Sequence, residues 1–151
     1  MSIKPIKLFL ALLVMISINL NCLSQEKNNE QKINYKTGNP ADWPKKLDAV
    51  VSVPKNHKIL LENERVRVFE VTLAPGEVEN LHFHQWPSVL YIQEAGNFID
   101  SDGDGNVIFD SRNLPEPLTL PMTMYKNPEA PHSVVNLSDT ETIRLIRVEM
   151  K

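Results

Sequence analysis

Cysteine is almost absent from the sequence, which has Cys22 alone among its 151 residues. No intramolecular disulfide can form, so the core has to be held together by the burial of side chains alone. If an N-terminal segment is removed after Ser24, the mature domain contains no thiol at all. A cysteine nucleophile and a thiolate metal ligand are then excluded.

Basic residues are not in excess either, since 16 Lys and Arg stand against 19 Asp and Glu. No basic cluster lies on any expected element, which argues against nucleic acid as a partner. The chain also lacks a glycine-rich phosphate loop after a strand and a Gly-x-Ser-x-Gly nucleophile elbow. Its length favours one domain with a single core.

Long apolar runs are confined to the N-terminus. There, Lys4 and Lys7 precede an apolar run over residues 8–18, and polar residues follow at once. The run has the length of a signal-peptide core and is too short to span a bilayer comfortably. We expect residues 1–24 to be a signal peptide and the exported, mildly acidic protein to be periplasmic or extracellular.

A lipoprotein anchored through Cys22 is the alternative to simple secretion. The residue before the modified cysteine of such a signal is normally Gly, Ala or Ser, and this chain has Asn21 there. Simple secretion is therefore the favoured interpretation, and a lipid anchor at Cys22 stays open.

Residues 25–39 are rich in Lys, Asn, Gln and Glu, which predicts a flexible leader before one folded domain at residues 40–151. The domain is expected to begin with a short helix near residues 42–51, with Asp42 as its N-cap and Pro44 tolerated in its first turn. The apolar side chains of this helix should cover the sheet as a lid: Trp43, Leu47 and Val50 or Val51.

From residue 58 to residue 150 the pattern changes to short β-rich runs separated by turn residues. The expected strands are residues 58–61, 65–74, 80–85, 88–94, 98–101, 107–110, 118–125, 132–136 and 142–150. Nine short strands with almost no helix predict an all-β sandwich or barrel. Several strands are apolar on both faces, which suits a barrel whose outside is partly covered, as in a homodimer.

The most informative stretch is the strand expected at residues 80–85, where His82 and His84 are two residues apart. Side chains alternate faces along a strand, so both imidazoles point the same way and Phe83 points the other. Their spacing of about 7 Å along the strand lets both reach one metal ion. A polar pair on a solvent-exposed strand has the same pattern, so the metal interpretation needs a third ligand, and His132 lies in a similar apolar segment.

These residues resemble the two motifs of the cupin superfamily. Gly76, followed after five residues by His82-x-His84, matches the first half of the first motif, and Gly96 matches its closing glycine. Residues 132–136 match the His-x-x-x-Asn end of the second motif. The order of the motifs and the all-β pattern agree with this resemblance.

The resemblance covers roughly residues 58–150 and implies a cupin-type double-stranded jelly-roll barrel. More narrowly, the run His-x-His-x-Trp-Pro-Ser-Val-Leu-Tyr is similar to that of small single-domain exported bacterial cupins. The first motif of cupins also supplies a metal-binding glutamate, which should fall five residues after His84, where this chain has Val89. The second motif lacks its usual glycine and has Glu129 at that position.

The metal ligands that the resemblance implies are thus reduced to His82, His84 and His132. Three histidines suffice for a facial metal site with open positions, and thiol dioxygenases among the cupins have such an iron site. Three neutral ligands leave the full charge on a divalent transition metal, such as Fe, Mn, Ni or Zn, and so favour a small anionic substrate. This supports a dioxygenase-like or Lewis-acid metalloenzyme. A non-catalytic small-molecule-binding cupin and a vestigial metal-free cupin stay open.

Tyr91 and His57 are the other two side chains with chemistry suited to the site. In a regular strand Val89, Tyr91 and Gln93 share the face that the cupin register turns inward, so Tyr91 could be catalytic by donating a hydrogen bond to a metal-bound ligand. Its alternative role is to fill the barrel as a half-buried aromatic ring. His57, which precedes the first strand between lysines, is expected to be exposed.

Arg144 and Arg147 lie on opposite faces of the last expected strand, so at most one of them enters the barrel. The inward one could hold a substrate carboxylate, or pair with Glu70 or Glu149.

Overall fold

The computed structural model describes residues 39–151. The predicted signal peptide, the anchor position Cys22 and all but the last residue of the predicted leader lie outside the described residues, and stay predictions. Within residues 39–151, no helix has the length and apolar character needed to cross a membrane.

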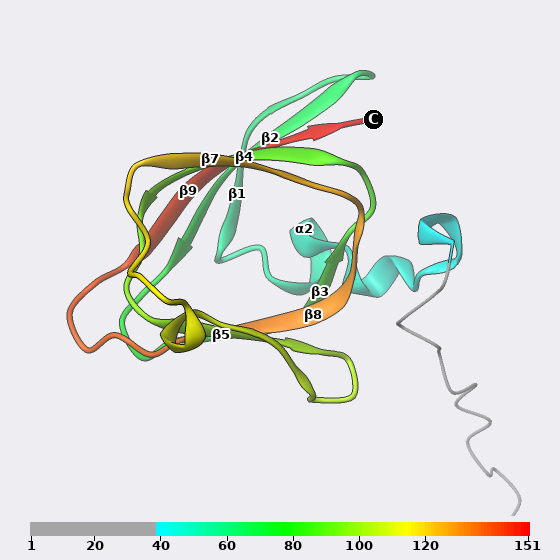
Figure 1. The fold of residues 1–151 in the computed structure, drawn as a ribbon. Helices are drawn as coiled ribbons and strands as arrows, with labels where there is room; N and C mark the ends of the chain where they lie inside the picture. The colour runs from blue at the N-terminus through cyan, green and yellow to red at the C-terminus, as the bar shows by residue number, and fades with distance from the viewer. Residues whose placement is uncertain (1–38) are drawn as a thin grey trace, which may run out of the picture. The chain divides into compact units, whose positions relative to one another are not determined.

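All nine predicted strands are present, and they form two antiparallel sheets that curl into a barrel (Figure 1). One sheet has five strands in the order β1-β2-β9-β4-β7, and the other has four in the order β3-β8-β5-β6. The strands are β1 (His57–Glu62), β2 (Val66–Leu73), β3 (Val78–His84), β4 (Ser88–Glu94), β5 (Phe98–Asp102), β6 (Val107–Asp110), β7 (Met122–Lys126), β8 (Glu129–Asn136) and β9 (Ile143–Met150). Because β2 pairs with β9 and β3 with β8, segments from both ends of the domain line one interior.

Burial follows the two-residue period of the strands. In β2, Phe69, Val71 and Leu73 are buried and point inward. In β4 the buried positions are Ser88, Leu90 and Ile92, while the residues between them are exposed. Alternation of this kind puts every second side chain of a strand into the barrel.

The predicted helix near residues 42–51 forms as three short pieces: the 3-10 turns η1 (Pro40–Asp42) and η2 (Lys45–Leu47), and the single α-turn α2 (Ala49–Ser52). Asp42 is not the N-cap. Asn39 caps η1 and Asp48 caps α2, each by accepting a hydrogen bond from a backbone N–H two residues on. Pro44 lies between the first two pieces in an extended conformation, which interrupts a continuous helix.

The predicted lid is confirmed for Trp43, which is buried and packs against Phe83 of β3 with ring centroids 5.2 Å apart. Phe83 thus points away from the barrel interior, as the alternation of β3 requires. Val51 is exposed instead of packed, and Ala49 takes the buried position in α2.

Two glycines of the motif region have clear backbone roles. Gly76 has φ +69° in the turn between β2 and β3, a conformation that residues with a side chain rarely adopt. At Gly96, between β4 and β5, a Cβ atom would lie 2.6 Å from Cβ of Ser138, so only glycine allows the two loops to pass this closely.

Candidate metal centre

Strand β3 positions the first two histidines as predicted. His82 and His84 are both buried and point into the barrel, on the side opposite Phe83. Glu79 lies three positions before His82, a spacing that would put it on the opposite face of a regular strand, but a register shift between the two turns Glu79 inward as well. A bulge of this kind lets one strand present an extra side chain to the same face.

All four histidines of the chain converge at this point. His132 on β8 is the direct strand partner of His82, and their ring centroids are 4.5 Å apart. His57, at the start of β1, lies 5.0 Å from His82 and 5.1 Å from His84 between ring centroids. The prediction that His57 is exposed is therefore wrong: only 4% of its surface is accessible.

Each histidine has an oxygen atom close to its Nδ1. For His82 this is the backbone carbonyl of Asn80, at 2.8 Å. For the others it is a carboxylate: Glu149 at 2.7 Å from His84, Asp100 at 2.9 Å from His132, and Glu79 at 3.0 Å from His57. The Glu79 contact is off the direction of a hydrogen bond, whereas the other three are hydrogen bonds. Histidines that bind a metal through Nε2 usually donate Nδ1–H to such an oxygen, which fixes the ring.

The donor atoms form two overlapping groups, each compact enough for one ion. His57, His82 and His84 offer ligand atoms that all lie within 4.8 Å of one another, and so do His84, Glu129 and His132. His84 belongs to both groups. The buried three-histidine cluster His57, His82 and His84 could therefore hold a metal ion, and Nε2 of His132, which is buried without a hydrogen-bond partner, borders the same space.

The charge states of His82 and His84 suit metal binding, whereas that of His132 does not. Burial lowers the pKa of His82 and of His84 well below 6.5, and neighbouring positive groups lower both further, so these rings are neutral at pH 7. Burial also lowers the pKa of His132, but the hydrogen bond and the charge of Asp100 outweigh burial and raise it above 6.5. A neutral imidazole is the form that coordinates a metal.

Glu149 on β9 supplies the buried carboxylate that β4 lacks. It pairs in the ladder with Ser88, which is fully buried, and its pKa is raised to about 7 by burial against the opposing effect of Arg147 and Arg67. The inward position of β4 is thus Ser88, four residues after His84, and not Val89. The carboxylate beside His84 comes from the neighbouring strand.

The interior position predicted for Tyr91 is wrong. Its side chain lies on the outer face of β4 with 43% of its surface exposed, and the inward neighbours are Leu90 and Ile92. The sequence argument placed the inward face one residue too late, and a shift of one residue turns every side chain of a strand to the other side. Tyr91 does not border the cavity that the histidines line.

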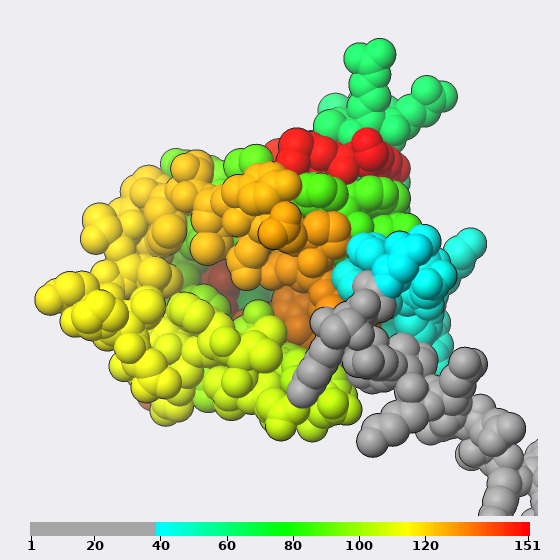
Figure 2. Space-filling view, turned by 45° about the vertical axis from the view of Figure 1, so that its right-hand side comes forward, coloured from blue at the N-terminus to red at the C-terminus, as the bar shows by residue number. Residues whose placement is uncertain are grey.

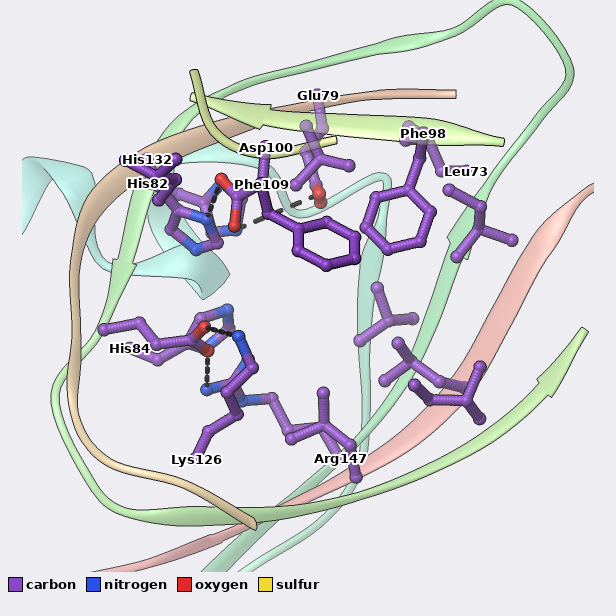
Figure 3. A pocket seen from close by; sticks show the side chains of 18 of the residues that line it. Leu73, Glu79, His82, His84, Phe98, Asp100, Phe109, Lys126, His132 and Arg147 are labelled. Atoms are coloured by element: carbon purple, nitrogen blue, oxygen red, sulfur yellow. Dashed lines mark hydrogen bonds and ion pairs between the residues drawn. The ribbon is translucent and has the colours of Figure 1, made fainter. Parts of the chain in front are cut away.

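That cavity has a volume of about 810 Å³ and opens to the surface. Figure 2 shows the opening as a hollow framed by the segments from β5 to β8, with atoms of β9 visible at depth. The histidines line one side of it, and Leu73, Phe98 and Phe109 line the opposite side (Figure 3).

A cluster of opposite charges borders the histidines in the cavity. Arg147 points inward, as the alternation of β9 allowed, and Arg144 lies outside beside Glu70. Nζ of Lys126 lies 2.8 Å from Oε1 of Glu129, and the Arg147 guanidinium lies 2.6 Å from Oε2. Burial raises the pKa of Glu129, but Arg147, His132 and Lys126 outweigh it and hold that pKa at about 2.

Sequence reasoning missed His57 and Asp100. It named Glu149 only as a possible partner of the inward arginine, and Oε1 of Glu149 does lie 3.8 Å from Nε of Arg147. His57 lies next to a lysine and outside any alternating pattern, so its sequence gives no burial signal. Glu149 had a usable signal, because it lies two residues from the inward Arg147 and therefore on the same face of β9. Asp100 lies on β5, whose neighbour in the sheet, β8, only the fold identifies.

Comparison with known proteins supports the fold. No family model matches the sequence, and no curated protein matches it. Among solved structures, a cupin domain from Bordetella pertussis is similar at 25% identity and a TM-score of 0.51, over 63% of this chain and 91% of that one. An RmlC-like cupin with a double-stranded β-helix fold from Methanocaldococcus jannaschii is similar at 17% identity and a TM-score of 0.45, over 62% and 77%. The two antiparallel sheets and the likeness to the Bordetella pertussis domain show a cupin-type fold, which confirms the predicted fold class.

Proposed function

We propose that this cupin-fold protein holds one divalent transition metal, such as Fe, Mn, Ni or Zn, at its histidine cluster and acts on a small anionic substrate that enters the same cavity. The observation that supports this best is the orientation of the rings. An oxygen atom within 3.0 Å of every Nδ1 leaves the Nε2 atoms as the nitrogens available to a metal.

His57, His82 and His84 are the core ligands in this proposal, and His132 is the fourth. His132, whose pKa is raised above 6.5, would have to lose its proton to bind the ion. Four neutral nitrogens would then leave the charge on the ion uncompensated, so an anionic substrate would be attracted to it.

A bound metal would supply a Lewis acid that polarises the substrate, or an electron donor for dioxygen chemistry. The protein supplies the rest. Glu149 and Asp100 orient His84 and His132 through their Nδ1 atoms. Lys126 and Arg147 lie in the lining beside the histidines, where a substrate anion can be held.

A cupin that binds a small molecule without converting it is the second candidate. The observation that favours it is the outward position of Tyr91, the one acid–base residue that the sequence suggested for the site. Metal-dependent oxygen consumption or substrate turnover would distinguish the metalloenzyme from this binding protein.

The first experiment measures the metal content of the untagged protein after separate reconstitution with iron, manganese, nickel and zinc. We expect close to one ion per chain, and loss of the ion in His84→Ala, because His84 belongs to both donor groups. Gln93→Ala is the matched control, since Gln93 is exposed on the outer face of β4. Protein without metal in every reconstitution would rule out the metal site and leave the binding protein. Comparing His57→Ala with His132→Ala then tests which of the two is the stronger ligand.

A further inference from the structure

The outer face of the five-stranded sheet carries a row of apolar side chains that crosses every strand. The row consists of directly opposed residues on β1, β2, β9, β4 and β7, which are Leu61, Val68, Val148, Val89 and Tyr125. On β2, β9 and β4 the residues before and after the row are buried inside the barrel, so the row itself points outward. Opposed side chains on one face of a sheet lie about 5 Å apart, so these five form one continuous surface.

Two further apolar pairs widen the row, one on each side of it. Val66 of β2 is opposed to Met150 of β9, and Tyr91 of β4 is opposed to Ile146 of β9. The helical pieces η2 and α2 pack on β3 and β1. Within residues 39–151 the middle of the outer face therefore stays open, with 43% of the surface of Tyr91 and 59% of that of Tyr125 exposed.

The extent of this face matches the needs of a dimer. Five strands at a spacing of about 4.8 Å are about 24 Å wide, and seven residues at about 3.3 Å each are about 23 Å long. The face therefore measures about 550 Å², and two such faces would bury about 1,100 Å², which is above the roughly 1,000 Å² that a specific interface needs. A second copy of the chain fits best, because a two-fold axis sets the same face against itself and covers it on both copies.

The charged groups of the face also suit a copy of the same face. They lie toward the end of the sheet where β9 begins. Arg144 is 3.4 Å from Glu70 and 4.0 Å from Glu94, and Lys58 is 3.9 Å from Glu70. Two cations and two anions leave this group without net charge, so the face neither attracts a strongly charged partner nor repels its own copy.

We propose that the outer face of the five-stranded sheet is the interface of a homodimer, in which the apolar row of one copy packs against that of the other. Tyr91, Tyr125 and Met150 would be its largest contact residues, and tyrosine and methionine are enriched in protein interfaces. The histidines point to the inner side of the barrel, so the pairing of copies does not depend on a metal.

Sedimentation equilibrium of the untagged protein measures the association. We expect a dimer at about 100 μM protein, because an interface of about 1,100 Å² is small for a stable complex. The dimer should persist in about 1 M NaCl, where ion pairs are screened and apolar contacts are not. A monomer at about 100 μM would overturn the second copy as the occupant of this face. A dimer that dissociates in the salt would overturn it too, because charges would then hold the copies together.

Matched variants locate the interface. Val89→Glu and Tyr125→Glu each place an unpaired carboxylate in the apolar row and should raise the dissociation constant of the dimer at least about 100-fold. Val107→Glu is the control and should leave the constant unchanged, since Val107 is as exposed as Tyr125 but lies on β6 of the other sheet. A dimer that withstands both substitutions in the row, or that Val107→Glu also dissociates, would contradict the proposed position of the interface.

Tyr125→Ala separates loss of the interface from loss of the fold, because it removes contact area without placing a charge on the sheet. It should raise the dissociation constant about tenfold, whereas Val107→Ala should not change it. Far-ultraviolet circular dichroism checks that both variants keep their sheets. An unchanged dissociation constant in folded Tyr125→Ala would show that Tyr125 does not contact the second copy, and would overturn the packing of row against row.

Discussion

His132 and Asn136 lie four residues apart on β8 and are both buried, but they differ in how many of their polar side-chain atoms have a hydrogen-bond partner. The side-chain amide of Asn136 donates to the carbonyl oxygens of Leu73, Ala74 and Glu141, and its oxygen accepts from Ser138 N–H. His132 is bound at Nδ1 only, and its Nε2 is buried with no partner. Asn136 thus links the end of β2 to the segment before β9, whereas His132 keeps one ring nitrogen available to a ligand.

The same contrast holds for the two regions around these residues. Seven buried side-chain nitrogen and oxygen atoms between residues 39 and 151 lack a hydrogen-bond partner within the protein. Six of them surround the histidine cluster, and they are His57 Nδ1, Glu79 Oε1, Ser88 Oγ, His132 Nε2, Arg147 Nε and Glu149 Oε2. Four of the six have an ion-pair contact without hydrogen-bond geometry, as between His57 Nδ1 and Glu79 Oε1 at 3.0 Å, whereas Ser88 Oγ and His132 Nε2 have none. Buried polar groups are normally satisfied, so a concentration of open ones marks a place where a ligand completes the structure. We call the surroundings of Asn136, where the side-chain polar atoms are hydrogen-bonded, the closed region, and the histidine cluster the open region. The closed region stabilises the fold, and the open region serves function.

The largest effect should come from opening the closed region. Asn136→Leu leaves buried carbonyl oxygens without a donor and should lower the free energy of unfolding by about 3 to 5 kcal/mol. Asn106→Leu, which makes the same change in the exposed turn between β5 and β6, should cost less than about 1 kcal/mol. Urea denaturation of both variants measures the difference. Equal losses would show that Asn136 has no special structural role.

A pH-dependent effect should appear at Glu149, in the open region. Its pKa is about 7 in the folded protein and 4.5 in the unfolded chain, so above pH 4.5 the unfolded chain releases a proton that the folded protein keeps. Its contribution to stability therefore falls as the pH rises from 4.5 to 7, by on the order of 3 kcal/mol. Glu149→Gln removes this dependence.

The measurement is urea denaturation of the metal-free wild type and of Glu149→Gln at pH 5 and at pH 8. The variant should gain stability relative to the wild type as the pH rises. The lowered pKa values of His82 and His84 act in the opposite sense, since their contribution is lost as the pH falls below 6.5, but both histidines are present in both proteins. Parallel pH profiles would contradict the raised pKa of Glu149.

A smaller effect is expected when a histidine of the open region is made apolar. His82→Leu in the presence of a chelator should change the free energy of unfolding by less than about 1.5 kcal/mol, because the variant no longer buries an imidazole and frees only the carbonyl of the exposed Asn80. Adding metal should then stabilise the wild type and not the variant. A loss as large as that of Asn136→Leu would remove the distinction between the two regions.

The sequence predicted the strands and the inward face of β3 because both depend on local alternation. His82 and His84 are two residues apart, and no distant information is needed to place them on one face. His132 followed from the resemblance of its motif. His57 and Asp100 could not be found in this way, because their positions depend on which strands lie side by side. The sequence of a single segment does not predict with which strand it pairs.

The error on β4 has a different cause. Residues 85–87 connect β3 to β4, and counting five residues from His84 to Val89 assumed that the connection keeps the alternation in phase. The strand begins at Ser88 with its side chain buried, so the true inward face is one residue earlier. One misplaced residue moved both the expected carboxylate and Tyr91 to the wrong side.

Tyr91 therefore gives the smallest effect and the sharpest check of that register. Tyr91→Phe removes a hydroxyl from the outer face of β4 and should leave metal content unchanged, with stability altered by less than about 0.5 kcal/mol. Leu90→Ala, one residue away on the inner face, should instead cost about 2 to 4 kcal/mol and enlarge the cavity. Metal analysis and denaturation of the two variants compare the faces directly. If Tyr91→Phe lowered the metal content while Leu90→Ala left stability unchanged, β4 would have to present its other face to the barrel, and the open polar region would include a phenol in place of Ser88.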